Sequence, residues 1–480
     1  MKQLILLFLL ITHFAYSQTV YQINDVEKPA EPSGGVSMLN HFISSNIEIP
    51  IRQASKGINS RVFVKGVVEL DGSMTGLEIV RGIDSISNQE AIRLMSLYKA
   101  WKPALIKGAA VRQSLIYPLT FKIDKVANFD STLNARIYYL DKNETRTEQA
   151  EGAKYRIVIP VDLYGYVNQD LQYQTLKGGK WKTSNTFAIK KSEKWVNLNE
   201  ENKPDSILVT HISVPNNELN RPFQEVTLKK DGRLWAYTDY DSKGRPILTK
   251  SFYLNGVLKK TDVHSDSLLL RTRWFEKGLI SSVVQFYDDS RRNSPLVIKG
   301  VWDKDGIPLL KDGNGWCRIP SISYRGPEVW EEGVVVNGYK SGKWVGKLKD
   351  STLFYQEVYD AGVLLQGISF QGGQQVDYTE EIQQPQFEGG VAKMYQFLGQ
   401  NISYPTYAAK AGVRGKVYLS FVVCEDGSLC DYEVVKGLES SIDNEAVRVV
   451  KKMSGKWTPG LERGRKVRVK YYLPVNFQLN

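Results

Sequence analysis

A chain of 480 residues is too long for one hydrophobic core, and we expect about three domains. A hydrophobic content of 42% and a charged content of 24% are ordinary for globular protein and argue against long disordered stretches. The net charge of +11 comes without a zinc-knuckle, basic-helix or aromatic–glycine RNA-binding pattern, which argues against nucleic acid as a partner.

Residues 1–17 have the pattern of a secretory signal. Lys2 is followed by the apolar stretch Leu4 to Ile11 and by the small-x-small cleavage pattern Ala15-Tyr16-Ser17. The apolar run is about eight residues long, whereas a membrane-spanning helix needs about 20. We therefore predict a cleaved signal and an exported, soluble protein. A retained N-terminal membrane anchor is the alternative.

Residues 32–121 recur as residues 387–477. Matched pairs include Gly34 with Gly389, Asp71-Gly72 with Asp426-Gly427, and Glu90-Ala91 with Glu445-Ala446, all at an offset of 355. One inserted residue then changes the offset to 356, so that Trp101 matches Trp457 and Pro118 matches Pro474. A register held over this length indicates one fold made twice.

The first copy, residues 32–123, alternates helical and strand patterns. An apolar stripe at Ala91, Leu94, Met95 and Tyr98 predicts a helix, and Ser87-x-x-Glu90 predicts a capping box at its start. Asp71-Gly72 predicts a tight turn between two strands. This copy carries 11 basic and 6 acidic side chains, against 14 and 9 in residues 384–480, so the basicity belongs to the repeat. It indicates either a generally cationic domain or a surface for acidic partners.

Residues 130–370 differ from both copies. Units of an aromatic residue, a polar turn with glycine and a branched aliphatic residue recur there, as in Tyr253 to Leu258, Trp302 to Ile307 and Tyr359 to Leu364. Each unit predicts a β-hairpin, and the series resembles divergent MORN-like repeats. A spacer and a ligand-binding surface both remain open as its role. Residues 371–386 are predicted to be a linker.

The second copy, residues 387–480, shows its elements more clearly. Val391 to Leu398 predicts a helix, and Val417 to Val423 alternates like a strand with one buried face. Ala446 to Met453 predicts a second helix, and Val467 to Phe477 predicts a closing strand. Pro474 in that strand argues for a position at the edge of the sheet. We therefore predict an α+β fold, with helices packed on a three-stranded antiparallel sheet in each copy, flanking a mostly-β hairpin region.

Two of the three cysteines flank the predicted turn of the second copy. Cys424 and Cys430 could form a disulfide across this hairpin, depending on whether the register puts them on one face. The first copy has Glu69 and Thr75 at these positions, so the fold does not require such a bridge.

Both copies resemble the C-terminal domain of TonB-type energy transducers. The residues that carry the resemblance are Tyr404-Pro405, Gly412, Asp426-Gly427, Glu445-Ala446, Trp457-x-Pro459 and Pro474-x-x-Phe477. The first copy departs at Ser60, where the family has Gly, and at Ile49, where it has Tyr. The resemblance implies a periplasmic domain that pairs with an extended segment of an outer-membrane transporter by edge-strand addition.

Carried over, the pairing strand of the second copy would present Lys466, Arg468, Lys470, Tyr471, Tyr472 and Phe477. The equivalent residues in the first copy would be Arg112, Ser114, Tyr117 and Phe121. An exposed sheet edge offers unpaired backbone donors and acceptors to such a guest strand.

The chain departs from a true transducer because it has no proline-rich spacer and has a signal that we predict to be cleaved. Passive binding of envelope or outer-membrane protein segments is therefore our first hypothesis. An energy-transducing subunit with a retained anchor is the alternative, and binding of an anionic envelope polymer is a second one. Dimerisation through the repeated domains also remains open.

No catalytic pattern, cofactor or metal is predicted. The chain contains no nucleophile elbow and no phosphate loop. His41, His211 and His264 lie far apart in sequence and outside any metal-ligand spacing. We expect a non-catalytic protein.

Overall fold

The computed structural model describes residues 19–147, 149–198, 206–213, 224–241, 245–265, 267–287, 295–321, 329–371 and 373–478. The predicted signal, residues 1–17, lies outside this part of the chain. The chain divides into two units, one formed by residues 1–127 and 276–279 and the other by residues 128–275 and 280–480. In the described part, no helix has the length and apolar content needed to cross a membrane.

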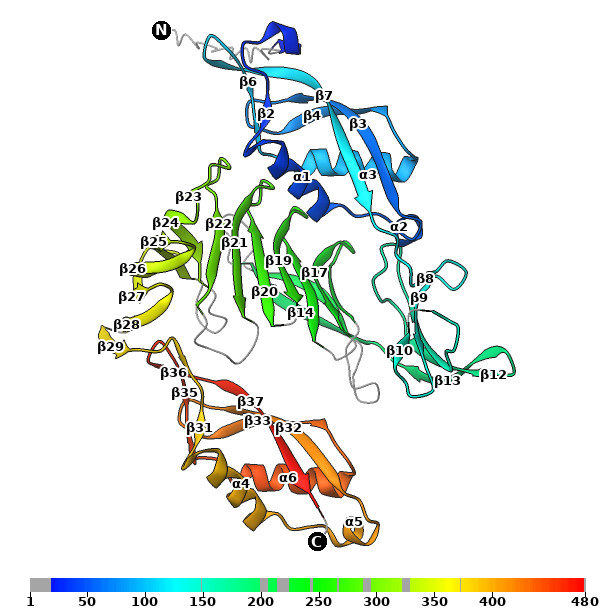
Figure 1. Ribbon diagram of the computed structural model, residues 1–480, viewed down its shortest axis with the longest axis vertical. Coiled ribbons are helices and arrows are strands. Elements are labelled where there is room, and N and C mark those ends of the chain that lie inside the picture. The colour runs from blue at the N-terminus through cyan, green and yellow to red at the C-terminus, as the bar shows by residue number, and fades with distance from the viewer. Residues whose placement is uncertain are drawn as a thin grey trace, which may run out of the picture. The chain divides into compact units, whose positions relative to one another are not determined.

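The first unit contains the first copy and the residues ahead of it. Its elements are β1 (Val20–Tyr21), the short 3-10 helix η1 (Ile23–Asp25), β2 (Glu31–Pro32), α1 (Gly35–Asn46), α2 (Ile51–Ala54), β3 (Ile58–Val68), β4 (Met74–Arg81), α3 (Ser85–Leu97), β5 (Trp101–Lys102), β6 (Ala104–Ile106) and β7 (Ala109–Ile123). The main sheet has the order β1-β7-β3-β4, with β6 also paired to β7, and β2 pairs with β5 separately. Helix α3 packs on β3 and β4 (Figure 1).

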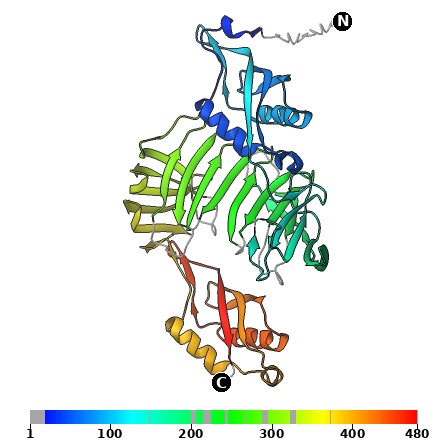
Figure 2. The same cartoon turned by 45° about the vertical axis from the view of Figure 1, so that its right-hand side comes forward.

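The middle of the second unit consists of three antiparallel sheets whose strands mostly follow chain order. The first contains β8 (Phe129–Asp130), β9 (Ala135–Leu140), β10 (Arg146–Thr147), β11 (Tyr155–Pro160), β12 (Leu171–Lys177) and β13 (Lys180–Phe187). The second contains β14 (Lys190–Asn197), β15 (Ser206–Ser213), β16 (Gln224–Lys229), β17 (Leu234–Tyr240), β18 (Pro246–Phe252), β19 (Leu258–Ser265), β20 (Leu268–Trp274), β21 (Ile280–Tyr287) and β22 (Val297–Val301). The third contains β23 (Leu310–Lys311), β24 (Asn314–Pro320), β25 (Val329–Val336), β26 (Tyr339–Leu348), β27 (Leu353–Asp360), β28 (Val363–Gln371) and β29 (Gln374–Tyr378). Figure 2 shows the strands of the second sheet running side by side.

Glycines within the third sheet make room for aromatic rings on the neighbouring strand. Trp344 pairs with Gly333, and Tyr355 pairs with Gly346. A Cβ atom added at Gly346 would lie 2.3 Å from the Tyr355 ring, so no other residue fits there without a shift. These two glycines therefore have a packing role, whereas the glycines of the predicted hairpin units, such as Gly256 and Gly306, have positive φ angles.

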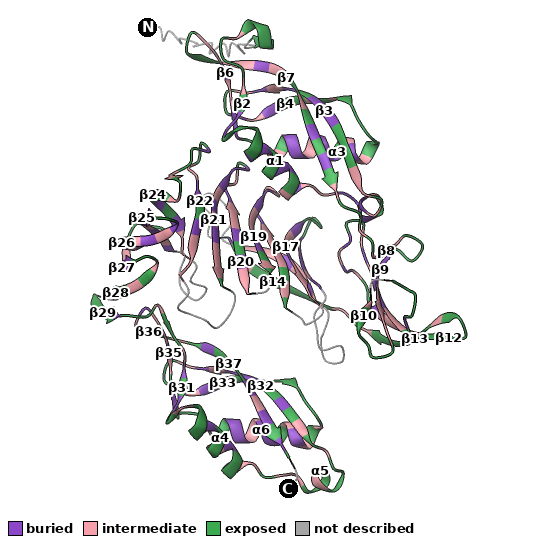
Figure 3. Cartoon of the chain, in the orientation of Figure 1, coloured by how far each residue is buried: buried purple, intermediate pink, exposed green. Residues whose placement is uncertain are grey.

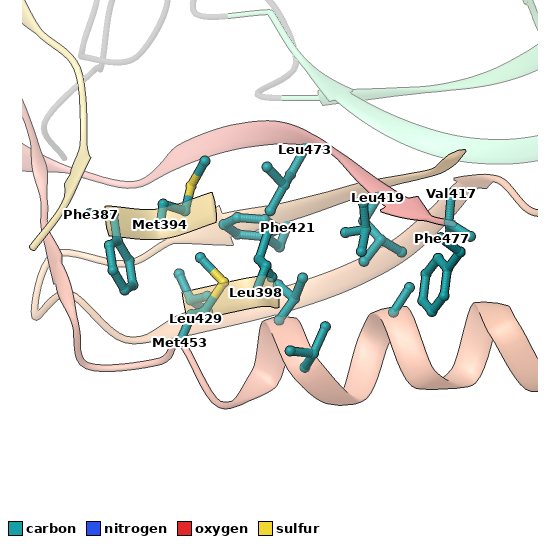
Figure 4. Packing of buried hydrophobic residues seen from close by; sticks show 14 of the residues in the cluster. Phe387, Met394, Leu398, Val417, Leu419, Phe421, Leu429, Met453, Leu473 and Phe477 are labelled. Atoms are coloured by element: carbon teal, nitrogen blue, oxygen red, sulfur yellow. The ribbon is translucent and has the colours of Figure 1, made fainter. Parts of the chain in front are cut away.

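The second copy closes the second unit. Its elements are β30 (Ile382–Gln383), β31 (Gln386–Phe387), α4 (Gly390–Asn401), α5 (Thr406–Lys410), β32 (Gly415–Val423), β33 (Leu429–Lys436), α6 (Ser440–Lys451), β34 (Trp457–Thr458), β35 (Gly460–Glu462), β36 (Arg465–Val467) and β37 (Val469–Phe477). The strand orders are β33-β32-β37, β30-β35-β36 and β31-β34. Burial alternates along β32 and β37 (Figure 3). The buried side chains of these strands pack against those of α4 and α6. Figure 4 shows Leu419, Phe421 and Leu473 between the strands and helix α6.

The α+β fold class predicted from the sequence is wrong. Strands make up 54% and helices 14% of the described residues, so the protein is mostly β, with many antiparallel sheets. The prediction gave the helical stripes of the two copies too much weight, whereas each hairpin unit between them contributes long strands. The predicted three-stranded sheet is also wrong for the first copy, because β1 and β6 both add to β7.

Two local predictions also need correction. The cap of α3 is Asp84, whose carboxylate accepts a hydrogen bond from the Ser87 backbone N–H, so Ser87 and Glu90 do not form a capping box. The predicted closing strand, Val467 to Phe477, starts later because Arg465–Val467 pairs with β35 instead.

Candidate functional site

The candidate site is strand β37 of the second copy. All its residues pair with β32, from Val469 opposite Val423 to Phe477 opposite Gly415. In the part of the chain that the structure describes, no strand pairs with the other side of β37. The equivalent residues of the first copy have the same register, since Tyr117 lies opposite Val64 and Phe121 opposite Ser60.

Pro474 indicates which backbone groups of β37 face outward. Proline has no N–H, so it leaves the β32–β37 ladder intact only where the backbone nitrogen points away from β32. Strand residues alternate in direction with a period of two. Lys470 and Tyr472 therefore share the phase of Pro474, and we expect their N–H groups to point outward.

The predicted site residues do not form one surface. Tyr471 is half-buried, with its ring 4.9 Å from the Trp457 ring centre, and Phe477 is fully buried in the core. Tyr472 is 64% exposed on the other face of the strand. Lys466 is exposed but belongs to β36, paired with Leu461.

The two exposed cations near β37 have acidic neighbours from β33. Arg468 Nη2 lies 2.7 Å from Asp431 Oδ2, and Lys470 Nζ lies 3.0 Å from Glu433 Oε2. The hydrogen bond from Lys470 lowers the pKa of the Glu433 carboxyl. These ion pairs reduce the positive field that the sequence alone suggests along this strand.

In the first copy, the four predicted residues occupy different environments. Arg112 makes two hydrogen bonds to Glu69, at 2.6 and 2.8 Å. Ser114 and Tyr117 are half-buried, and Phe121 is fully buried in the core. The outer side of β7 is partly occupied, because β1 pairs with it at Arg112 and Gln113.

The two cysteines of the second copy lie on the same face of the β32–β33 hairpin. Their Sγ atoms are 2.6 Å apart, and both are free thiols in this structure. Arg468 Nη2 lies 3.3 Å from Cys430 Sγ. The predicted disulfide therefore stays a prediction, with the two sulfur atoms already side by side. Cys317 is fully buried elsewhere, and burial raises its pKa to about 12.

Sequence reasoning missed a buried ionic cluster around Arg463. This residue forms the tip of the β35–β36 hairpin. Its guanidinium contacts two glutamates of the third sheet, in β25 and β27, and a third that directly precedes β30. Nε lies 2.8 Å from Glu357 Oε1, and Nη2 lies 3.2 Å from Glu331 Oε1 and 3.3 Å from Glu381 Oε2. The guanidinium also lies over the Tyr355 ring, 4.0 Å from its centre.

Neighbouring side chains complete this cluster. Lys340 Nζ lies 2.8 Å from Glu331 Oε2, and the Tyr378 hydroxyl donates to Glu357 at 2.7 Å. Burial opposes ionisation of Glu331, but Lys340 and Arg463 outweigh it and lower the pKa of this carboxyl to about 2. One pattern in the sequence could have predicted the cluster. Glu331 has the same strand phase as Gly333 and Val335, which places a glutamate on the buried face of the strand.

The cluster has a structural role, because it joins the β35–β36 hairpin to the third sheet. Each carboxylate has a cation or hydroxyl partner, as buried charges require. Among the described residues, no group of three or more His, Cys, Asp and Glu side chains could hold a metal ion.

Comparison with known families decides the identity of the two copies. Residues 45–123 and 400–479 both match the family described as the Gram-negative bacterial TonB protein C-terminal. Both copies are TonB C-terminal domains. The family is a non-catalytic one, concerned with binding and energy transduction, and its domains interact with outer-membrane transporter proteins. The match to this Gram-negative family indicates the cell envelope as the location of the protein. No curated protein matches the chain.

Proposed function

We propose that this protein is a non-catalytic periplasmic binding protein, in which β37 pairs with extended segments of envelope or outer-membrane transporter proteins. The observation that carries the proposal is the outer side of β37, which has no strand partner among the described residues, in a TonB C-terminal domain. An unpaired strand edge binds an extended peptide through backbone hydrogen bonds.

The side chains around this edge support a moderately selective site. Tyr472 offers a large exposed ring beside the edge, and aromatic residues are frequent anchors in protein interfaces. Lys470 and Arg468 add positive charge that is partly balanced by Glu433 and Asp431. This balance favours a protein segment over a polyanionic envelope polymer, which would need a stronger basic surface.

The test uses Tyr472→Pro in the full chain, with Tyr472→Val as the matched control. We expect proline to remove an outward N–H and leave the β32–β37 ladder intact, whereas valine keeps the N–H and changes only the side chain. Periplasmic and outer-membrane proteins are captured with each variant and identified by mass spectrometry. Binding should be lost with proline and retained, at most weakened, with valine.

Unchanged partners with a folded Tyr472→Pro variant would contradict the proposal. Thermal unfolding followed by circular dichroism checks that the variant is folded. The energy-transducing alternative is separated by N-terminal sequencing of the protein from cells. A chain that starts at Gln18 has lost the anchor that this alternative needs. Polymer binding is separated by sedimentation with cell-wall material at increasing salt, because the binding of charged polymers weakens as salt screens it.

A further inference from the structure

The segments that precede the two copies pair in the same way close to each domain, but they pair differently further upstream. Glu31 and Pro32 pair with Lys102 and Trp101, just as Gln386 and Phe387 pair with Thr458 and Trp457. Upstream of this, Lys28 bridges to Leu105, and Gln383 pairs with Leu461 at the equivalent position. The repeat therefore extends, in register, to the residues that precede both domains.

The two segments diverge further upstream. In the first copy, Val20 and Tyr21 run parallel to β7 opposite Arg112 and Gln113. The offset of 355 makes Gln375 and Val376 their equivalents, and these residues lie in β29 and pair with β28. The equivalent stretch of the second copy, Arg468–Val469, has no second strand beside it among the described residues.

From this contrast we propose that residues 19–25 are a built-in guest strand that occupies the pairing edge of the first TonB C-terminal domain. At Arg112 and Gln113 the edge of the first domain is thereby closed to outside strands, whereas the same edge of the second domain is open to partners. This inference rests on the proposed function, because it assumes that the edge of β37 is a binding edge. It assigns different roles to two domains of the same family.

Hydrogen bonds hold the segment that follows the guest strand, residues 27–30, against the first domain. The Ala30 N–H donates to Gln113 Oε1 at 2.6 Å, and Gln113 is only 1% exposed. The Lys107 N–H donates to Glu27 Oε2 at 3.0 Å. Val469 stands at the position of Gln113 in the second copy and has no polar group to offer. The anchoring amide is thus present only where a guest strand is bound.

Arg112, which precedes Gln113 on β7, is also held by a side-chain contact. Arg112, which lies opposite Val20, is held by Glu69, and Glu69 also accepts a hydrogen bond from Thr75 at 2.5 Å. The hydrogen bond with Arg112 lowers the pKa of the Glu69 carboxyl. Backbone and side chains of this stretch of β7 are therefore arranged before any outside partner arrives.

The test compares Val20→Pro/Tyr21→Pro with the control Ile23→Pro, each in the full chain. Proline in β1 removes N–H donors and disturbs pairing with β7. Ile23 is the first residue of η1 and is 60% exposed, a position that accepts proline. The probe is a fluorescent peptide with the sequence of residues 19–25, Thr-Val-Tyr-Gln-Ile-Asn-Asp.

We expect the double variant to bind this peptide at least about tenfold more tightly than the wild type or the control. Amide hydrogen exchange at Arg112–Ser114 should become faster in the double variant and slow again when the peptide is added. Equal binding by the double variant and the control would overturn the proposal. Loss of peptide binding on adding Tyr472→Pro would also overturn it, because the peptide would then be bound by the second domain.

A cross-link provides a second measurement that needs no proline. Adjacent strands lie about 4.8 Å apart, which is within the range of Cα separations that a disulfide bridges. Under mild oxidation with a small-molecule disulfide, Tyr21→Cys/Gln113→Cys should therefore cross-link, with two thiols oxidised and the reagent reduced. Ile23→Cys/Gln113→Cys should not. Failure of the first pair to cross-link would refute the inference while leaving the proposed role of β37 intact.

Discussion

Glu90 and Glu445 are equivalent residues of the two copies and make the same hydrogen bond in each domain. Glu445 Oε1 accepts a hydrogen bond from the Ser403 N–H at 2.6 Å, and Glu90 does the same for the Glu48 N–H. Arg448, three residues after Glu445, bonds both the glutamate and the Asn401 carbonyl. Each glutamate thus ties the segment that follows the first helix of its domain to the second helix.

We predict that Glu445→Gln lowers the free energy of unfolding by about 1–3 kcal/mol at pH 7, because the hydrogen bonds from Arg448 and Ser403 lose the negative charge of their acceptor. Arg448 lowers the pKa of Glu445, although burial opposes it. A lowered pKa gives stability that is present above the unfolded-state value of about 4.3 and is lost as the pH falls through the folded-state value.

The difference between wild type and Glu445→Gln should therefore shrink as the pH drops below about 4. Urea unfolding at several pH values measures it. Glu433→Gln is the control, because its ion pair with Lys470 is exposed and such pairs contribute little. A difference that stays constant down to low pH would mean that the carboxylate charge is not what stabilises this contact.

At the scale of elements, the alternation of apolar residues and the turn residues were sufficient to predict the hairpins of the two domains. The strand predicted at Val417 to Val423 became β32, and the predicted left-handed turn glycines have φ of +82° at Gly72 and +80° at Gly427. Element ends were harder to predict, because tertiary pairing decides them. β36 leaves the closing strand to pair with β35, and nothing in the residues Arg465–Val467 alone signals this.

The β32–β33 hairpin supplies a prediction at this scale. Oxidation of Cys424 and Cys430 should raise the stability of the second domain, by about 2–3 kcal/mol for so short a loop. The thermal midpoint should therefore fall when a reductant is added. The replacement Cys424→Glu/Cys430→Thr installs the residues of the first copy, Glu69 and Thr75, and should remove the dependence on reductant. A wild-type midpoint that is insensitive to reductant would show that no bridge forms.

At the scale of the whole molecule, the sequence predicted the duplicated family but not the proportion of strand. The hairpin units of residues 130–370 have irregular spacing, so their number and their joining into long sheets depend on contacts between distant residues. The buried glutamates were equally hard to foresee. Glu331 and Glu357 are stable in a core because Lys340 and Arg463 provide the opposite charge, and Arg463 comes more than a hundred residues later in the chain.

This dependence gives the last prediction, on how the second domain is held to the β23–β29 sheet. Arg463→Met keeps an unbranched apolar side chain at this position but removes the guanidinium that lies over Tyr355, which leaves Glu357 buried beside Glu331 with Lys340 as the remaining cation. Breaking a buried ion pair from one side costs about 3–5 kcal/mol. We therefore expect a large loss in chemical unfolding followed by tryptophan fluorescence.

Lys107→Met is the matched control, because Lys107 occupies the same hairpin tip in the first copy and is exposed. Its effect should stay within about 0.5 kcal/mol. Adding Glu357→Gln to Arg463→Met should restore part of the loss, since it removes the carboxylate left without its partner. Equal effects of Arg463→Met and Lys107→Met would show that the hairpin tip is replaceable. Other contacts, such as the hydrogen bonds from Arg465 to the carbonyls of Phe354 and Phe370, would then be sufficient to hold the second domain to the sheet.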